Sequence, residues 1–404
     1  MFFLLLIVGM IFPFAGIIFG LAYFNQFREP FRAALLQGVS WSAALYGYIG
    51  DQGNDIYRHM SNLSLYKDLP FYQCFDVLAS KHLRAVYTWD IWSWVMARFD
   101  NHHLLQSSGA LVGYAVISYI LFDYFNNNDF ETKEWIPIWV FVISITSPLN
   151  YAVGIRYANA FAIFCLAVYL YYFRNNKVLT VLFCIVAVFL HHGVLLPLLC
   201  WILVPLLKKH RFIFSIVFVI LLFTFNNYGY YLSQMSGGNG VLSDLVSNTM
   251  FSAAAYQENG INNSFHAIVS RTLIIIFNVS LVIRTRGGWK EVWNNGEGKA
   301  EYNVWNLSLL LTIASICMIL LIGSNGSRFF FVSDLFTALL LIYSRGYIPP
   351  YRSLPYGLFD WIILLTAFGN LALSLYDMNW GTGSLPSFLL SLVFGYSTRW
   401  LFPF

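Results

Sequence analysis

The sequence predicts an all-α protein that crosses a membrane many times. Of its 404 residues, 58% are hydrophobic, 19% are aromatic and only 10% are charged, whereas a soluble domain is about 25% charged. So few charged side chains cannot cover the water-exposed surface of a soluble fold of this length. The composition also excludes a disordered chain, a disulfide scaffold and a basic nucleic-acid-binding domain. The net charge of +4 is expected when Lys and Arg gather in cytoplasmic loops.

The apolar runs give thirteen candidate spans, because a helix that crosses the bilayer needs about 20 apolar residues and fewer where it is enclosed by protein. They lie at 2–24, 33–50, 104–125, 135–148, 156–173, 178–191, 193–207, 212–227, 267–284, 304–322, 329–344, 357–376 and 387–402. The short pair on either side of His191, His192 and Gly193 is alternatively a broken hairpin. The predicted number of spans is therefore eleven to fourteen, with thirteen preferred.

The basic residues predict the orientation. With alternating spans, one set of loops holds fifteen of the 23 Lys and Arg residues: Arg28, Arg32, Lys133, Arg174, Lys177, Lys208, Lys209, Arg211, Arg284, Arg286, Lys290, Lys299, Arg345, Arg352 and Arg399. Basic loops mark the cytoplasmic side. The N-terminus is then periplasmic and the C-terminus cytoplasmic. Residues 1–404 form one helical domain in this prediction, with long outer loops at 51–103 and 228–266.

Residues 77–99 of the first outer loop predict a helix that lies in the membrane interface. Apolar side chains including Val86, Ile91 and Val95 recur there at helical spacing, whereas Asp90 points elsewhere. The tryptophans of this helix belong at headgroup level, or alternatively stack on sugar rings.

The functional candidates are ionisable groups at the outer ends of the spans, because such groups cost about 2.5–3.5 kcal/mol at bilayer depth. They are Asp55, Arg58, His59, Arg156, His191, His192 and Arg328. Arginines beside helix starts suit a diphosphate, since a guanidinium binds phosphate oxygens in a planar, two-pronged geometry. Arg156 and Arg328 are the predicted diphosphate ligands, and Arg58 is a weaker third. Snorkelling to lipid headgroups is the structural alternative.

Metal and disulfide chemistry is not predicted. Four of the five cysteines (Cys165, Cys184, Cys200 and Cys317) lie in apolar runs and read as small buried hydrophobes, whereas Cys74 lies in a polar loop. No spacing of Cys and His residues resembles a ligand set. Asp334, inside a span below Arg328, reads as a residue that neutralises a neighbouring charge.

Three segments resemble the EpsG/Wzy-like polysaccharide polymerases. GNDIYRHM (Gly53 to Met60) is similar to that family's G-T-D-x-x-x-Y motif, with Asn54 in place of a hydroxyl residue. IRYANAFAIFCLAVYLYYFRNNKVLTVLFCIVAVFLHHGVLL (Ile155 to Leu196) is similar to its Arg–helix–basic turn–helix–His segment, with Tyr157 after the arginine and a doubled His. GSNGSRFFFVSDLF (Gly323 to Phe336) is similar to its late Arg–aromatic motif.

The resemblance implies a bacterial inner-membrane glycosyltransferase of the Wzy type with a GT-C-like bundle. Such an enzyme joins polyprenyl-diphosphate-linked oligosaccharides, donor and acceptor, into O-antigen or capsule at the periplasmic face, needs no cofactor, and works beside a chain-length regulator in the membrane. In that scheme His192 or His191 takes the proton of the attacking hydroxyl in preference to Asp55, because imidazole accepts a proton near neutral pH.

Two other classes remain open. A flippase for the same lipid-linked sugar would spread its charges through the depth of the membrane and often shows repeat symmetry. A membrane acyltransferase would place its essential His in a span or on the cytoplasmic side. Here the candidates gather on one predicted face and no repeat is visible.

Overall fold

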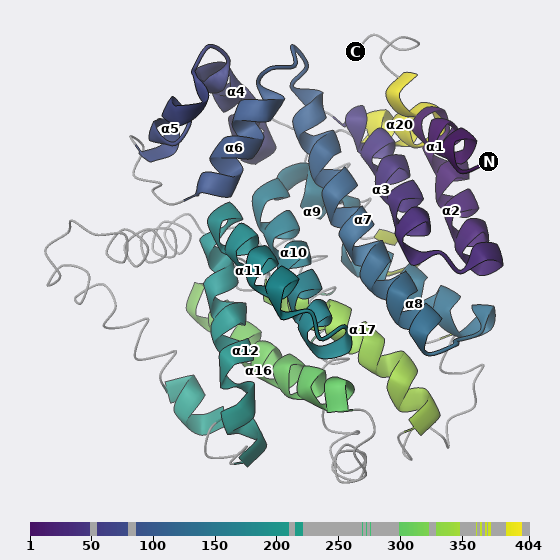
Figure 1. Cartoon of the computed structure of the whole chain (residues 1–404), viewed down its shortest axis with the longest axis vertical. Coiled ribbons are helices and arrows are strands. Elements are labelled where there is room, and N and C mark those ends of the chain that lie inside the picture. Colours follow the sequence, from purple (N-terminus) through teal and green to yellow (C-terminus); the bar gives the residue numbers. More distant parts are fainter. Residues whose placement is uncertain are drawn as a thin grey trace, which may run out of the picture. The chain divides into compact units, whose positions relative to one another are not determined.

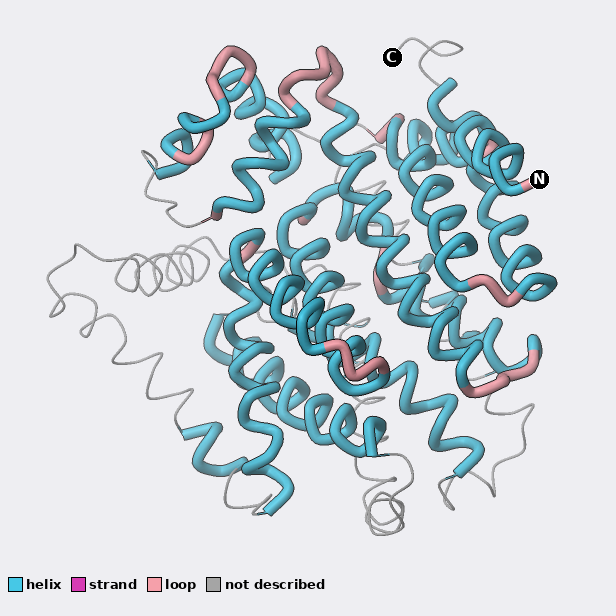
Figure 2. Tube along the Cα trace, viewed as in Figure 1, coloured by secondary structure: helices cyan, strands magenta, loops and turns pink. Residues whose placement is uncertain are grey.

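The computed structural model describes residues 1–48, 55–79, 86–209, 215–220, 299–322, 329–347 and 385–397, and single positions within 269–275 and 361–372. Helices are the only regular elements in this part of the chain, which confirms the all-α prediction (Figures 1 and 2). The chain divides into two compact units. The first comprises residues 1–77, 87–191 and 363–404, and the second comprises residues 78–86 and 192–362. The single domain stays a prediction.

The first apolar run forms two helices where the sequence predicts one over 2–24. They are α1 (Phe2–Ile11) and α2 (Pro13–Phe27), and Phe12 between them has φ −128° and ψ 77°. Proline cannot donate to the preceding turn and favours the first helical position, so Pro13 ends α1 and starts α2. Glycines let the two helices meet: a Cβ on Gly16 would lie 2.4 Å from the Cα of Gly9.

Helix α7 (His103–Asn127) is the centre of the first unit. It packs along α3 (Pro30–Tyr46) and also contacts α9 (Pro148–Val153) and α10 (Ile155–Phe173). Small residues permit these contacts, as is typical of helix pairs in membranes. A Cβ on Gly38 of α3 would lie 2.7 Å from the carbonyl oxygen of Leu111, and one on Gly113 would lie 2.0 Å from the Tyr151 ring.

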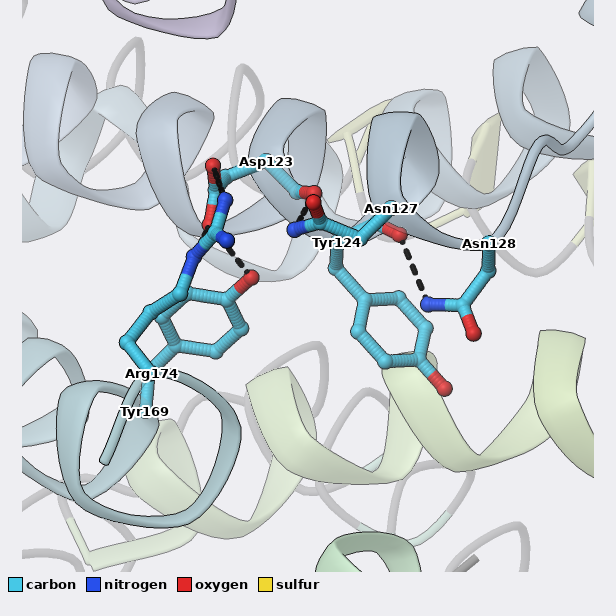
Figure 3. Close-up of polar contacts among 6 residues, drawn as sticks. All are labelled: Asp123, Tyr124, Asn127, Asn128, Tyr169 and Arg174. Carbon is cyan, nitrogen blue, oxygen red and sulfur yellow. Dashed lines mark hydrogen bonds and ion pairs between the residues drawn. The ribbon is translucent and has the colours of Figure 1, made fainter.

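A buried ion pair joins the C-terminal ends of α7 and α10 (Figure 3). Asp123, whose side chain is 5% exposed, accepts hydrogen bonds from both arms of the Arg174 guanidinium, and its Oδ2 lies 2.7 Å from Arg174 Nε. The Tyr169 hydroxyl donates to the same oxygen at 2.7 Å. The carboxylate is therefore satisfied by three donors, as burial requires.

The other helices of the first unit extend this core. They are α4 (Asp55–Tyr66), η1 (Phe71–Gln73), α6 (Tyr87–Met96), α8 (Thr132–Ile145), α11 (Lys177–Leu190), α20 (Leu385–Phe394) and η4 (Gly395–Ser397). The short helix α5 (Asp76–Ala79) begins in the residues of the first unit and ends in those of the second. Helix α11 packs antiparallel to α10 after a short turn, and also contacts α6. The predicted interfacial helix over 77–99 is shorter than expected, since α6 covers only its second half and residues 80–85 lie outside the described part.

The second unit holds η2 (His192–Val194), α12 (Leu195–Lys209), α16 (Lys299–Ile322) and α17 (Phe330–Tyr347). Helix α16 packs against both α12 and α17. The predicted break after His191 is present, because α11 ends at Leu190 and η2 precedes α12.

Two helices, α7 and α10, are long and apolar enough to cross a membrane, and several shorter apolar helices accompany them in the described residues. These helices fit a membrane protein. The thirteen spans and their orientation stay predictions, and most residues of the expected spans over 267–284 and 357–376 lie outside the described residues.

Candidate functional site

The candidate site is built on the packing of α4 against α6. Helix α4 buries Ile56, His59, Leu63 and Tyr66, which fall on one face at intervals of three and four residues. Helix α6 buries Trp89, Asp90 and Ser93, and exposes the apolar side chains of Tyr87, Ile91 and Val95. Two contacts hold α4 and α6 together. The His59 imidazole lies edge-on to the Trp89 ring, with 4.8 Å between ring centroids, and the Tyr66 hydroxyl donates a hydrogen bond to Asp90.

Arg156, in the first turn of α10, contacts the layer formed by α4 and α6. Its guanidinium carbon lies 5.7 Å from the centroid of the Trp89 ring, within the range of a cation–π contact. Gly154 is the N-cap of α10, so Arg156 also lies at the positive end of the helix dipole. Electrostatic interactions link it to Asp55, Arg58, Tyr66 and Asp90.

His59 is a buried imidazole among cations. It is 7% exposed, and burial, together with the positive charges of Arg156 and Arg58 and the neighbouring His191, holds its pKa well below the ordinary value. Charging this imidazole would cost both solvation and repulsion. His59 is therefore neutral at physiological pH.

Asp90 is a buried carboxyl on the same layer. It is 2% exposed and its Oδ1 accepts a hydrogen bond of 2.8 Å from the Tyr66 hydroxyl. Burial raises the pKa of Asp90 to about 7, although the Tyr66 hydrogen bond and the charge of Arg156 act in the opposite direction. The same burial and the Asp90 charge raise the pKa of Tyr66, so the phenol stays a donor.

Asp55 and Arg58 form an ion pair at the start of α4. The two groups lie 2.8 Å apart, with side chains 36% and 61% exposed. Exposed pairs of this kind contribute at most about 1 kcal/mol. The pair therefore leaves Arg58 able to exchange Asp55 for another anion.

The doubled His is divided between the two units. His191, which follows α11, belongs to the first unit, where its ring lies edge-on to Tyr157 at 6.4 Å and to Phe161 at 6.3 Å. It also interacts electrostatically with His59. His192 opens the 3-10 turn η2 of the second unit.

The described structure thus brings Asp55, Arg58, Arg156 and His191 into one neighbourhood of the first unit. Arg328 lies outside the described residues, and Asp334 in α17 is 5% exposed. The sequence did not single out Asp90 or the supporting role of Trp89. The interfacial pattern of 77–99 assigned Asp90 to a polar face, whereas the fold buries that face against α4. The polar residues His59 and Tyr66 on the apolar face of α4 were the available signal.

The arginines of this arrangement are able to bind an anion, and His and Asp side chains lie beside them. No cluster of three or more His, Cys, Asp or Glu side chains able to hold a metal ion occurs among the residues that the structure describes. Guanidinium groups suit phosphate oxygens, and imidazole suits proton transfer near neutral pH.

A comparison with protein families identifies a match over most of the chain. The model of the EpsG family matches residues 56–379, which are 324 of the 404 residues. No curated protein and no solved structure matches the chain. The matched range contains Arg58, Arg156, His191, His192 and Arg328, and begins one residue after Asp55.

Proposed function

The chain belongs to the EpsG family, whose members have a polysaccharide polymerase-like function, and we propose that it is a Wzy-type polymerase of lipid-linked oligosaccharide repeat units. Donor and acceptor are both polyprenyl-diphosphate-linked glycans in this proposal, and a chain-length regulator in the membrane is the expected partner. The product is an O-antigen or a capsular polysaccharide.

The proposed reaction is a single glycosyl transfer. A hydroxyl oxygen at the non-reducing end of the acceptor attacks the anomeric carbon of the donor, forming a new C–O bond. The bond between that carbon and the diphosphate oxygen breaks, and polyprenyl diphosphate leaves with the bonding electrons. The hydroxyl proton passes to a base on the enzyme. Cations must stabilise the charge that grows on the diphosphate.

Arg156 carries the proposal. It is the one arginine of the described site held by a buried aromatic ring, and Arg58 stands nearby in an exposed ion pair with Asp55. Both guanidinium groups are proposed to bind the diphosphate, and Arg328 is proposed as a third ligand from the sequence. The ion pair supports an orienting role for Asp55, so His191 or His192 stays the preferred base.

The site is proposed to face the periplasm from the inner membrane. Reporter fusions test this orientation: fusions after Lys209 and Arg286 are expected to report cytoplasm, and fusions after Lys67 and Gly240 are expected to report periplasm. A cytoplasmic signal at Lys67 would place Asp55, Arg58 and the α4–α6 layer on the wrong side for this reaction.

The function itself is tested in a deletion strain by measuring polymer length and lipid-linked intermediates. A polymerase defect abolishes polymer and leaves single repeat units on the lipid carrier at the outer face. Loss of these outer units instead would identify a flippase. An unchanged polymer with altered acylation would identify an acyltransferase.

The role of Arg156 is tested by complementing that strain with Arg156→Lys, which keeps the charge but loses the two-pronged geometry. Polymer is expected to be lost or strongly shortened at normal protein level. Arg98→Lys is the matched control, because Arg98 also lies over a tryptophan ring, that of Trp94 at 4.3 Å, in the predicted outer loop that holds Trp89. It is expected to keep normal polymer length.

A further inference from the structure

We propose that Asp90 is the buried counter-charge of Arg156, so that binding of the donor diphosphate to Arg156 is coupled to uptake of a proton by the Asp90 carboxyl. The inference rests on the proposed function, since it takes a diphosphate to be the ligand of Arg156. Asp90 acts through Arg156 in this scheme and is a positioning residue.

The geometry around Asp90 leaves its charge incompletely compensated. The carboxyl is 2% exposed and, among the described residues, accepts one side-chain hydrogen bond, from the Tyr66 hydroxyl at 2.8 Å. Within the described residues Arg156 forms no direct ion pair with it, and instead lies over the neighbouring Trp89 and acts across space. An ionised buried carboxylate requires several donors or a close cation. The Tyr66 hydrogen bond and, after it, the positive charge of Arg156 therefore favour the ionised form of Asp90.

A diphosphate on Arg156 removes that support. The pKa of Asp90 is about 7 in the unliganded protein, and the positive charge of Arg156 is one of the two influences that hold it down. A dianion beside Arg156 cancels this influence and adds repulsion of its own, and both effects favour the neutral carboxyl. The pKa of Asp90 rises above 7 when the donor binds, and the carboxyl takes up a proton.

Other titratable groups surround the same layer and compete for the proton. Tyr66 and Cys74 interact with Asp90, and Asp55, Arg58, His59 and His191 interact with one another or with Arg156. His59 is the principal competitor, because an anion would also raise its pKa. Burial is the largest cause of the low pKa of His59, however, and an anion does not remove burial. Asp90 starts near 7 and needs only a small further rise.

The coupling has a defined sign. The protonated form of Asp90 binds the diphosphate better, so affinity rises as pH falls through the pKa of the bound state and levels off below that of the free state, about 7. Between the two values each unit of pH changes the affinity by up to about tenfold, as expected for one linked proton.

The experiment measures proton uptake when the purified full-length protein binds methyl farnesyl diphosphate. This diester ionises far below neutral pH, so the probe contributes no proton. Titration calorimetry in two buffers of different ionisation enthalpy gives the number of protons taken up. At a pH just above 7 the wild-type protein is expected to take up a substantial fraction of one proton, and its affinity is expected to weaken as pH rises.

Two variants assign the proton. Asp90→Asn keeps an acceptor for Tyr66 but cannot titrate, so uptake is expected to vanish and the affinity to become independent of pH. Asp100→Asn is the matched control, since Asp100 is an exposed carboxylate paired with Lys67, and it is expected to keep the wild-type uptake. Tyr66→Phe removes the bond that lowers the pKa of Asp90, so the uptake is expected to move to higher pH. That result also stands if Asp90→Asn does not fold.

The possible outcomes distinguish failure of the Asp90 inference from failure of the proposed diphosphate site. Binding of the diester without proton uptake, or uptake that persists in Asp90→Asn and disappears in His59→Gln, overturns the inference and leaves the diphosphate site intact. Failure of the wild-type protein to bind the diester at all removes the diphosphate site, and the inference with it.

Discussion

The guanidinium of Arg156 lies over the ring of Trp89, with 5.7 Å between the guanidinium carbon and the ring centroid. Trp89 is 2% exposed and also contacts His59 edge-on. The Trp89 ring is therefore buried and offers no free face to a sugar. This excludes the sugar-stacking role that the sequence allowed for this tryptophan. Trp89 instead supports the arginine that the proposed function assigns to the diphosphate.

Replacement of Trp89 is expected to weaken donor binding in proportion to the aromatic face that is lost. Trp89→Phe keeps a ring under Arg156, whereas Trp89→Leu loses the cation–π contact, worth about 0.5–2 kcal/mol or roughly 2- to 30-fold in affinity. Calorimetric binding of the farnesyl diester measures the effect. Trp94→Leu, which removes the ring beneath Arg98, serves as the control, and an equal loss in that variant would contradict a specific role for Trp89.

Amide substitutions are expected to identify the base. His192→Gln or His191→Gln should lower the chemical step by about 10²- to 10⁴-fold, the contribution of general-base catalysis, while the donor stays bound. Asp55→Asn should reduce turnover less, because Asp55 already serves Arg58 at 2.8 Å. Turnover by the purified enzyme gives the answer. An inactive Asp55→Asn beside two active His variants would transfer the role to Asp55.

The Asp123–Arg174 pair is expected to behave as a unit. Arg174→Ala leaves a buried carboxylate with Tyr169 as its remaining side-chain donor. The loss should be about 2–3 kcal/mol, below the 3–5 of a fully buried pair, because the Arg174 side chain is 37% exposed. The double variant Asp123→Ala/Arg174→Ala should lose less than the single variant. Thermal unfolding in detergent tests this, and simple additivity of the two losses would show that the groups are independent.

Gly113 is expected to tolerate no side chain. A Cβ there would lie 2.0 Å from the Cε1 of Tyr151, and Tyr151 is fully buried, so Gly113→Ala should cost about 1–3 kcal/mol. Gly369→Ala is the control, since no described atom lies within 4 Å of a Cβ at that position and alanine favours a helix. The midpoint of thermal unfolding should fall in Gly113→Ala, and in Gly369→Ala it should rise or stay unchanged.

Apolar run length predicted the helices well where one run forms one helix. The ranges 104–125 and 156–173 nearly coincide with α7 and α10. The run 2–24 forms two helices instead of one, because hydropathy does not register that Pro13 lacks a backbone N–H and so interrupts the helix. Gly9 and Gly16 lie where α1 and α2 approach each other closely, and this contact is visible only in the folded chain.

The candidate site was predictable in part. Charges at span ends identified Arg58, Arg156 and His191 because an ionisable group is costly beside lipid, whatever surrounds it. Asp90 could not be found in this way, since it lies in a helix whose exposed stripe is apolar and whose buried face is polar. Only the pairing of α4 with α6 shows that this carboxyl is enclosed, and that pairing depends on contacts between residues 24 to 30 positions apart.

The close contact of α7 with the first turn of α10 has a thermodynamic consequence for ligand capture. A Cβ on Gly109 would lie 2.5 Å from the Cδ1 of Ile155 and 3.1 Å from the amide nitrogen of Asn159. Ile155 and Asn159 lie on either side of Arg156 in the sequence, so this close packing is expected to restrict rotation of α10 about its own axis. The backbone position from which the Arg156 side chain leaves the helix is then set when the protein folds. For the proposed lipid-linked donor, a site that is already ordered loses less conformational entropy on binding, so more of the interaction energy is expected to remain as affinity.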